Sequence, residues 1–317
     1  MKSSKKNSPK SSPLVSIVTP SFNQGEFLED AIKSILAQTY KNIEHVVVDG
    51  LSSYNTIEIL KRFKHIRWIS EKDHGYWDGI TKAVEMAKGK YVTICMASDG
   101  YLNRDWIKQC VEVLENDSEV SLVWGFPRWL EDGKLTDVCF PHFHRKGAPQ
   151  KFDWFPRWLM TGECLPNGNF VIRKDVFKKI NTATIKTPKG QELFDLNYNF
   201  NAMGYLPYNL PVIAEFGREH PGQIGRLWTQ KGWIPKAIAR YNNQIKEYRK
   251  ALIARKKSHV FRDSNGDSNK KQADLGNVNK FNEIIIKIDL YSRLIAQRVP
   301  TKLSRRIRSF LVRPLWP

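Results

Sequence analysis

The sequence has no apolar run that approaches the roughly 20 residues needed to cross a bilayer. Residues 1–13, MKSSKKNSPKSSP, carry the positive charge of a secretory signal but lack its apolar core, and are expected to form a flexible basic arm. The four cysteines (Cys95, Cys110, Cys139 and Cys164) show no C-x-x-C spacing, which argues against a zinc site or a disulfide framework. These absences favour the reducing cytosol, so we expect a cytoplasmic protein.

Acidic residues are scarce, with 32 Asp and Glu against 51 Lys and Arg, which gives a formal net charge of +19. Such a charge points to an anionic partner, which can be nucleic acid, an acidic membrane surface or a phosphorylated substrate. Excess lysine kept for solubility is the alternative. The basic residues crowd the two ends of the chain and form no nucleic-acid recognition motif, so nucleic acid is not the favoured partner.

Between residues 14 and 125, short β-prone segments alternate with segments of helical periodicity. The expected strands are residues 14–19, 43–50, 66–70, 91–97 and 120–125. The expected helices are residues 26–38, 56–63, 78–87 and 105–116. This alternation predicts βαβ units, and therefore an α/β fold with an open, mostly parallel sheet flanked by helices.

The rest of the chain is less regular. Residues 126–165, rich in Trp, Phe, Pro and Arg, are expected to form a long ordered loop, and a shorter α+β segment follows. Residues 126–257 are taken as the second half of the same domain. The polar, Gly- and Asn-rich residues 258–280 are expected to be a linker.

Residues 281–317 are expected to form a basic, amphipathic helical tail. From Pro300 onward an apolar stripe is flanked by Lys and Arg; the stripe consists of Leu303, Ile307, Phe310 and Leu311. A helix of this kind suits the headgroup region of an anionic membrane, which would make the protein peripheral at the inner face of the membrane. The alternative is that the tail packs onto the rest of the protein and its charges are solvated.

Two acids lie at the ends of strands of the predicted sheet: the second strand ends on Asp49, in VVVDG, and Asp99 follows YVTICMAS. Ligands of open parallel sheets bind outside the carboxyl ends of the strands. The turn PSFNQGEF, between the first strand and the first helix, offers free backbone N–H groups to an anion. One acid would meet the base or ribose of a nucleotide, and the other a divalent cation on its diphosphate. An Asp-Gly turn signal is the alternative for either acid alone.

The segments PLVSIVTPSFNQGEFLEDAIKSILAQTYKNIEHVVVDG and ISEKDHGYWDGITKAVEMAKGKYV resemble family 2 glycosyltransferases, which have the GT-A nucleotide-sugar fold. The resemblance is close over residues 14–125, the nucleotide-sugar-binding half, and looser over residues 160–225, on the acceptor side. It implies transfer of a sugar from a nucleotide-diphosphate donor, usually with inversion and usually with Mg²⁺ or Mn²⁺.

The resemblance also implies roles for individual residues. Those matching the first nucleotide loop are Thr19, Pro20, Phe22 and Asn23. Asp49 matches the acid that meets the base, while Asp73 and Asp78 lie in motifs beside the donor. Asp78 also has the features of a helix N-cap. Asp99 matches the D-x-D acid that holds the metal, through which the donor diphosphate is bound.

Two departures from the family pattern bear on activity. The chain reads Ser98-Asp99-Gly100-Tyr101 where relatives read S-D-D-x-Y, so it is one acid and one residue short. Tyr54 stands where D-G-x-S-x-D has its last acid. Weaker protein contacts to the metal are one consequence, with the diphosphate holding it instead. Loss of activity is the other.

On the acceptor side, an inverting transfer needs a general base. The segment GQELFDL corresponds to the family's acidic helix start, with Glu192 preferred and Asp195 second; helix-dipole stabilisation is the alternative. His220, in REHPGQIG, is a candidate contact for the diphosphate or metal, or a structural histidine. Trp154 and Trp158 are expected either to stack on sugar rings or to pack onto the sheet.

The favoured hypothesis is a glycosyltransferase that acts on a glycan or lipid-linked acceptor in surface polysaccharide or glycolipid biosynthesis. A non-catalytic family member that binds a nucleotide sugar or a partner is the second hypothesis. A basic membrane- or nucleic-acid-binding protein is the third; it accounts for the charge but not for the acids at the strand ends.

Overall fold

The structure is a computed structural model that describes residues 12–53, 55–138, 153–165, 168–182, 191–223, 226 and 229–263. Tyr54, Cys139, nearly all of the expected basic arm, most of the expected linker and the whole expected tail lie outside these residues. No helix in the described ranges is both long enough and apolar enough to cross a membrane.

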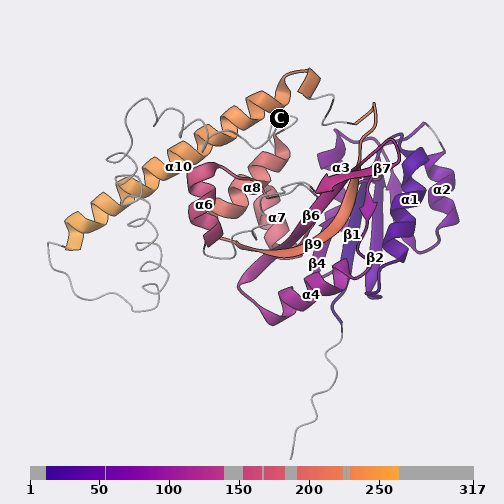
Figure 1. Ribbon diagram of the computed structural model, residues 1–317, viewed down its shortest axis with the longest axis horizontal. Coiled ribbons are helices and arrows are strands. Elements are labelled where there is room, and N and C mark those ends of the chain that lie inside the picture. The colour runs from indigo at the N-terminus through magenta and orange to yellow at the C-terminus, as the bar shows by residue number, and fades with distance from the viewer. Residues whose placement is uncertain are drawn as a thin grey trace, which may run out of the picture.

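The described residues form one nine-stranded sheet at the centre of the fold (Figure 1). Its strands are β1 (Val15–Ser21), β2 (Ile43–Asp49), β3 (Ile66–Ser70), β4 (Tyr91–Ile94), β5 (Gly100–Tyr101), β6 (Val120–Glu131), β7 (Lys134–Val138), β8 (Phe170–Arg173) and β9 (Leu206–Arg218). Their order is β3-β2-β1-β4-β8-β6-β9-β5, with β7 paired to β6. Strands β3, β2, β1 and β4 are parallel, so their carboxyl ends meet at one edge.

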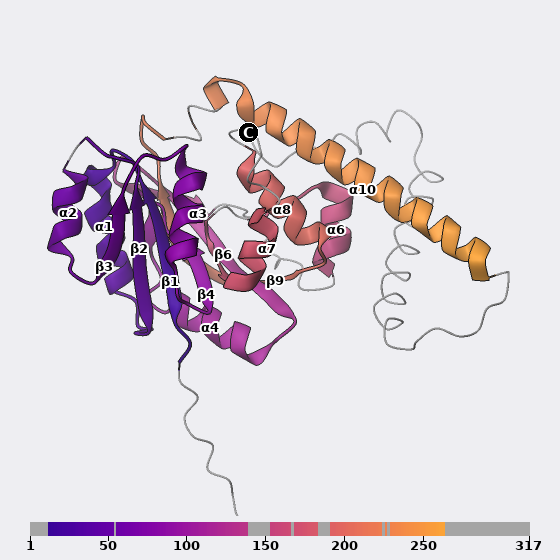
Figure 2. The same ribbon diagram turned by 180° about the vertical axis from the view of Figure 1, so that it is seen from behind.

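Helices cover both faces of this sheet (Figures 1 and 2). On one face lie α1 (Gly25–Leu36), α2 (Thr56–Arg62) and α4 (Trp106–Asn116). On the other lie α3 (Tyr76–Met86), α7 (Lys174–Thr182) and α8 (Glu192–Ala202). Each helix packs on the sheet through an apolar stripe. In α1 this stripe recurs every three or four residues and consists of the buried Leu28, Ala31, Ile32 and Ile35.

The strands and helices expected between residues 14 and 125 are all present, with small shifts at their ends. The expected loop at 126–165 is partly wrong, because β6 continues to Glu131 and pairs with β7. Asp132 and Gly133 join these strands with φ angles of 48° and 74°, which is the left-handed backbone that a two-residue hairpin turn needs.

Two further helices pack beside α8: α6 (Trp154–Thr161) and α10 (Trp233–Asp263). The 31-residue helix α10 was not predicted, and its last turns overlap the start of the expected linker at residue 258. Figure 1 shows α10 crossing α8 and α6 and projecting beyond them. Its buried Ala237, Tyr241 and Ile245, four residues apart, form the stripe that contacts these helices.

Sugar stacking by the two tryptophans of α6 is not possible in this fold. Trp154 is 1% exposed and Trp158 is fully buried. The Trp154 Nε1 donates to Asn201 Oδ1 (2.8 Å), and its ring lies 6.2 Å from that of Trp124 on the sheet. The Trp158 Nε1 donates to the Tyr241 hydroxyl of α10 (2.8 Å). The packing alternative therefore holds, with Trp154 against the sheet and Trp158 against α10.

In the parallel half of the sheet, a buried histidine of β2, His45, contacts Thr19 of the neighbouring strand β1. His45 Nε2 and Thr19 Oγ1 are 2.9 Å apart, and both residues are inaccessible to solvent or nearly so. Burial lowers the pKa of His45 from 6.5 to about 3. This contact places the Thr19 side chain in the core, away from the nucleotide loop in which it was expected.

His45 should make stability depend on pH. As pH falls from 6.5 toward 3, the unfolded chain takes up a proton that buried His45 does not, so the unfolding free energy should decrease. Each pKa unit is worth about 1.4 kcal/mol. Denaturant unfolding across this range should show the decline in the wild type and a shallower one in His45→Gln. The exposed His74→Gln is the control, and an equally shallow decline there would contradict the assignment.

Candidate functional site

The carboxyl ends of β1, β2 and β3 carry the first group of expected site residues. Asp49, at the end of β2, is fully buried. Its Oδ2 accepts hydrogen bonds from the Ser52 backbone N–H (2.9 Å) and Ser70 Oγ (2.7 Å), and its Oδ1 accepts from Ser52 Oγ. Because Asp49 is fully buried and both of its oxygens already accept hydrogen bonds from Ser52 and Ser70, the expected contact with a base requires this region to rearrange.

The loops after β1 and β2 are joined at this edge. Asn23, with a φ of 52°, accepts a hydrogen bond at Oδ1 from the Ser53 backbone N–H (2.9 Å), and its own N–H donates to Ser52 Oγ (2.8 Å). The joined loops expose two large apolar side chains: Phe22 is 60% and Leu51 56% exposed. Exposed apolar side chains at a strand edge suit a flat aromatic ligand.

Asp73 lies beside the same loops. A Cβ at Gly50 would fall 2.7 Å from Asp73 Oδ2 and 3.3 Å from Phe22 Cδ2, so only glycine fits this close approach. The Asp73 Oδ1 accepts a hydrogen bond from the Gly75 N–H (2.9 Å). The buried Pro20 packs nearby, with its Cβ 3.3 Å from the Cβ position of Gly79. Asp73, Phe22 and Pro20 are thus brought together.

Asp78 is not the N-cap of α3, because the helix begins at Tyr76 and Gly75 occupies the cap position. The Asp78 Oδ2 instead accepts a hydrogen bond from the His74 backbone N–H (3.1 Å) and forms an ion pair with Lys82 (3.3 Å). These contacts give Asp78 a structural role in the first turn of α3.

Asp99 lies past the end of β4, where β9 returns alongside β5. Its Oδ1 accepts hydrogen bonds from the Arg218 backbone N–H (3.1 Å) and Ser98 Oγ (3.1 Å). The Arg218 guanidinium donates to the Ser98 carbonyl oxygen (3.2 Å) and to Asp30 Oδ2 of α1 (2.9 Å). Burial raises the pKa of Asp99 to about 6, although both Arg218 and Ser98 favour the charged form.

His220 lies next to Arg218 rather than in a group with Asp99. Its ring is 5.0 Å from that of Phe27 on α1, and the Arg218 guanidinium lies 5.0 Å from the same Phe27 ring. Burial lowers the pKa of His220; the Glu26 charge opposes this shift, and the Arg218 charge acts in the same direction as burial. The buried His220 Nε2 has no hydrogen-bond partner in the part of the chain that the structure describes, so it remains a candidate contact for an anionic ligand.

The two candidate bases at the start of α8 have different surroundings. Glu192 is 8% exposed. Burial, and then the Glu192 charge, raise the pKa of Tyr76 at the start of α3. Asp195 instead faces α10, where Gln244 Nε2 donates to its Oδ1 (3.4 Å) and Arg240 lies 3.9 Å from its Oδ2. Glu192 is therefore the candidate beside the motif that contains Asp73 and Asp78.

One acid near the site was not identified from the sequence. Glu215 of β9 is 6% exposed and pairs in register with Tyr101 of β5, two residues after Asp99. Burial, and then the Asp99 charge, raise the pKa of Glu215 well above its usual range. A charged residue in the otherwise apolar segment LPVIAEF is the signal that would have drawn attention to it.

The residues around Asp99 fit a divalent cation that is shared with a diphosphate. Among the described residues, no three His, Cys, Asp or Glu side chains are grouped to hold a metal ion by themselves. Magnesium, however, is commonly bound by one or two carboxylates together with phosphate oxygens of the substrate. The hydrogen bonds to Asp99 use Oδ1 and leave Oδ2 for a cation.

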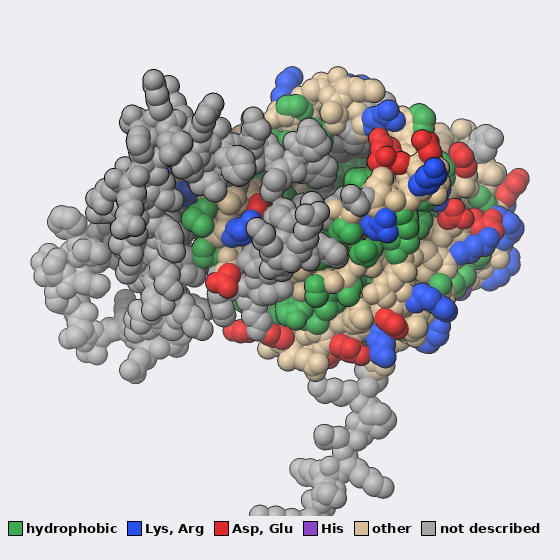
Figure 3. Space-filling view, in the orientation of Figure 1, with side chains coloured by type: hydrophobic (Ala, Val, Ile, Leu, Met, Phe, Trp, Pro, Cys, Tyr) green, Lys and Arg blue, Asp and Glu red, His purple; other side chains and the backbone are tan. Residues whose placement is uncertain are grey.

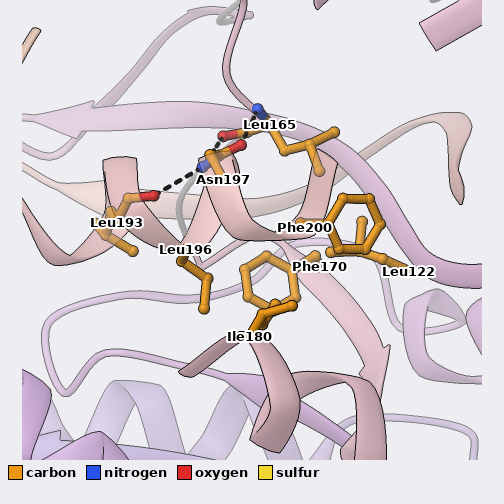
Figure 4. A pocket seen from close by; sticks show the side chains of 8 residues that line it. All are labelled: Leu122, Leu165, Phe170, Ile180, Leu193, Leu196, Asn197 and Phe200. Atoms are coloured by element: carbon orange, nitrogen blue, oxygen red, sulfur yellow. Dashed lines mark hydrogen bonds between the residues drawn. The ribbon is translucent and has the colours of Figure 1, made fainter. Parts of the chain in front are cut away.

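A small cavity between α7, α8 and the sheet does not belong to this site (Figure 4). Its lining is almost entirely apolar: Leu122, Leu165, Phe170, Ile180, Leu193, Leu196, Asn197 and Phe200. The one amide is already used, because Asn197 accepts from the Leu165 N–H (2.7 Å) and donates to the Leu193 carbonyl oxygen (3.0 Å). The cavity therefore offers no polar group to a nucleotide.

The chain belongs to glycosyl transferase family 2, whose model matches residues 16–180. An uncharacterized glycosyltransferase of Mycobacterium tuberculosis is 34% identical over 119 residues, which cover 37% of this chain and 45% of the relative. The putative teichuronic acid biosynthesis glycosyltransferase TuaG of Bacillus subtilis is 30% identical over 131 residues, covering 39% and 51%. The matches thus span about half the length of these relatives.

A solved structure has a similar fold: the mannosyltransferase PcManGT from Pyrobaculum calidifontis, in complex with GDP-Man and Mn²⁺. The TM-score is 0.50 at 17% sequence identity, and the match covers 78% of this chain and 76% of that protein. The fold of this chain is therefore of the GT-A type, an open α/β sheet flanked by helices.

Proposed function

We propose that this protein is a glycosyltransferase that moves a sugar from a nucleotide-diphosphate donor to a glycan or lipid-linked acceptor. The observation that carries the proposal is the strand edge itself, where the joined loops with Phe22 and Leu51 lie beside Asp49 and Asp73, and where Asp99 follows the neighbouring strand. Family membership supports it, as do a relative named for teichuronic acid synthesis and a structural neighbour that binds GDP-Man.

Different residues would contact different parts of the nucleotide-sugar donor. Phe22 and Leu51 would contact the base, and Asp73 the adjoining part of the nucleoside. Asp99 would hold a divalent cation, which when bound neutralises charge on the leaving diphosphate. Glu192 would take the proton of the attacking acceptor hydroxyl, with inversion at the anomeric carbon. Association of the basic tail with an anionic membrane, which would bring a lipid-linked acceptor within reach, is part of the same proposal.

The described residues on one face of the molecule carry mixed charge, which does not favour nucleic acid as the partner. On the face shown in Figure 3, Lys and Arg side chains are interspersed with Asp and Glu, and hydrophobic side chains gather near the centre. A nucleic-acid partner would favour a continuous basic surface instead. The described residues on this face form no such surface.

Phe22→Ala should weaken binding of UDP or GDP about tenfold, because stacking of a base on an aromatic side chain is worth about 1–3 kcal/mol. Isothermal titration calorimetry in the presence of Mn²⁺ measures the change. Leu36→Ala removes an apolar side chain of similar exposure (51%) from the far end of α1 and should leave affinity unchanged. Equal affinity of Phe22→Ala and wild type would remove Phe22 from the base site.

The function as a whole is tested by a thermal-shift screen of nucleotide sugars with and without Mn²⁺, followed by an assay for release of the nucleoside diphosphate. A donor that raises the melting temperature and is consumed in the presence of a glycan or lipid-linked acceptor supports the proposal. Binding without turnover would favour the non-catalytic alternative. Absence of binding to any nucleotide sugar would overturn both.

A further inference from the structure

The segment around Asp99 has no room for a second acid at the next position. A Cβ at Gly100 would lie 2.9 Å from the Phe216 ring and 3.0 Å from Ser34 Oγ. Phe216 itself pairs in register with Gly100, so β9 fills the space that a side chain at this position would use. A second carboxylate must therefore come from another strand.

Glu215 of β9 is placed to supply it. Successive residues of a strand point to opposite faces, so the Glu215 side chain points to the face opposite that of Phe216 and shares its face with its register partner Tyr101. A Cβ at Gly168 would lie 4.0 Å from Glu215 Oε1 and 3.9 Å from the carbonyl oxygen of Ile94, the last residue of β4. The Glu215 carboxyl group therefore lies near the carboxyl end of β4, where the segment leading to Asp99 begins.

The Glu215 carboxylate has no partner that would account for its burial. It is 6% exposed, and among the described residues it makes no hydrogen bond or ion pair. A buried carboxylate without such a partner is costly. Glu215 pairs in register with Tyr101, two residues after Asp99, so the pairing of β9 with β5 brings the two acids to the same end of these strands.

We propose that Glu215 and Asp99 together hold the divalent cation that the donor diphosphate binds, with Glu215 replacing from β9 the acid that the D-x-D segment lacks. The inference rests on the proposed function. Two carboxylates and phosphate oxygens are a sufficient ligand set for Mg²⁺ or Mn²⁺. The pair explains how a chain with one acid in this segment keeps a metal-supported donor site.

Mn²⁺ binding tests the pair without any turnover. Free Mn²⁺ is measured by electron paramagnetic resonance while protein is titrated in the presence of UDP or GDP. Glu215→Gln should weaken Mn²⁺ binding to the protein–nucleotide complex about tenfold or more. The double variant with Asp99→Asn should lose less than the sum of the two single losses, since both side chains bind one ion. Glu219→Gln, which removes an exposed acid of the same segment, is the matched control.

Each outcome decides between the inference and the proposed function. If wild type binds Mn²⁺ with UDP or GDP and Glu215→Gln binds it equally well, the inference fails while the function stands. If wild type binds neither nucleotide under any condition, the proposed function fails, and the inference with it. Melting temperatures establish that the variants are folded. Glu215→Asp, which keeps a carboxylate on a shorter side chain, should retain more Mn²⁺ affinity than Glu215→Gln if binding requires the charge.

Discussion

Asp99→Asn is expected to reduce transfer about 10²–10³-fold, which is typical for removal of a group that stabilises developing charge. The asparagine retains an oxygen that can accept hydrogen bonds from Ser98 and the Arg218 N–H, so the segment keeps its conformation. What it removes is the negative charge that binds a divalent cation. Both the rate and Mn²⁺-dependent nucleotide binding should therefore fall together.

The fold of this variant should be intact, because burial already raises the pKa of Asp99 to about 6 and a neutral side chain suits the site. The melting temperature should be unchanged or higher. Asp105→Asn is the control, since Asp105 accepts a hydrogen bond from Thr39 Oγ1 (2.6 Å), which lies beyond the C-terminal end of α1. Full Mn²⁺-dependent binding by Asp99→Asn would show that the cation is held elsewhere.

The first half of the fold was predictable because its patterns are local. Each strand of residues 14–125 is a short β-prone run, and each helix has its apolar stripe within one continuous segment. The β6–β7 hairpin also has a local signal, the turn dipeptide Asp132-Gly133 between two segments in which apolar and polar residues alternate. It was missed because the aromatic and proline content of residues 126–165 suggested a loop.

Helix α10 and the two buried tryptophans depend on contacts between distant segments. Trp158 of α6 is buried because Tyr241 of α10 covers it, and no pattern within the aromatic segment shows that partner. The apolar stripe of α10 lies among many charged residues, so it is visible in the sequence only when its three- and four-residue spacing is counted. The tryptophans of α6, which the sequence alone left as candidates for stacking on a sugar ring, are part of the core in the structure.

The candidate site residues also fall into those with a local sequence signal and those placed only by contacts between distant segments. The motif positions Phe22, Asp73 and Asp99 lie at the predicted strand edge because parallel strands bring their carboxyl ends together. Glu215 lies more than a hundred residues after Asp99, and it comes beside it only through the pairing of β9 with β5. A sequence motif cannot include such a residue, since its position depends on the whole sheet.

Glu192→Gln is expected to lower kcat by about two orders of magnitude or more, because general base catalysis contributes at least that much. Glutamine matches the shape of Glu192 but cannot take up the proton of the acceptor hydroxyl. Donor affinity should be unchanged, so the loss should be in kcat and not in the dissociation constant for UDP or GDP. Steady-state kinetics beside calorimetry with the nucleotide measures the two effects separately.

Asp195→Asn is the matched comparison, because the two acids lie on the same helix and differ in what they face. Asp195 contacts Gln244 and Arg240 of α10, so its loss should weaken the packing of α10 and lower the melting temperature with little change in kcat. The residue after Glu192, Leu193, packs against the same core cluster as Tyr76 at the start of α3, and the Glu192 charge acts on the Tyr76 hydroxyl. The reverse result, a loss of kcat in Asp195→Asn and none in Glu192→Gln, would assign the base to Asp195 and require α10 to move away from it during catalysis.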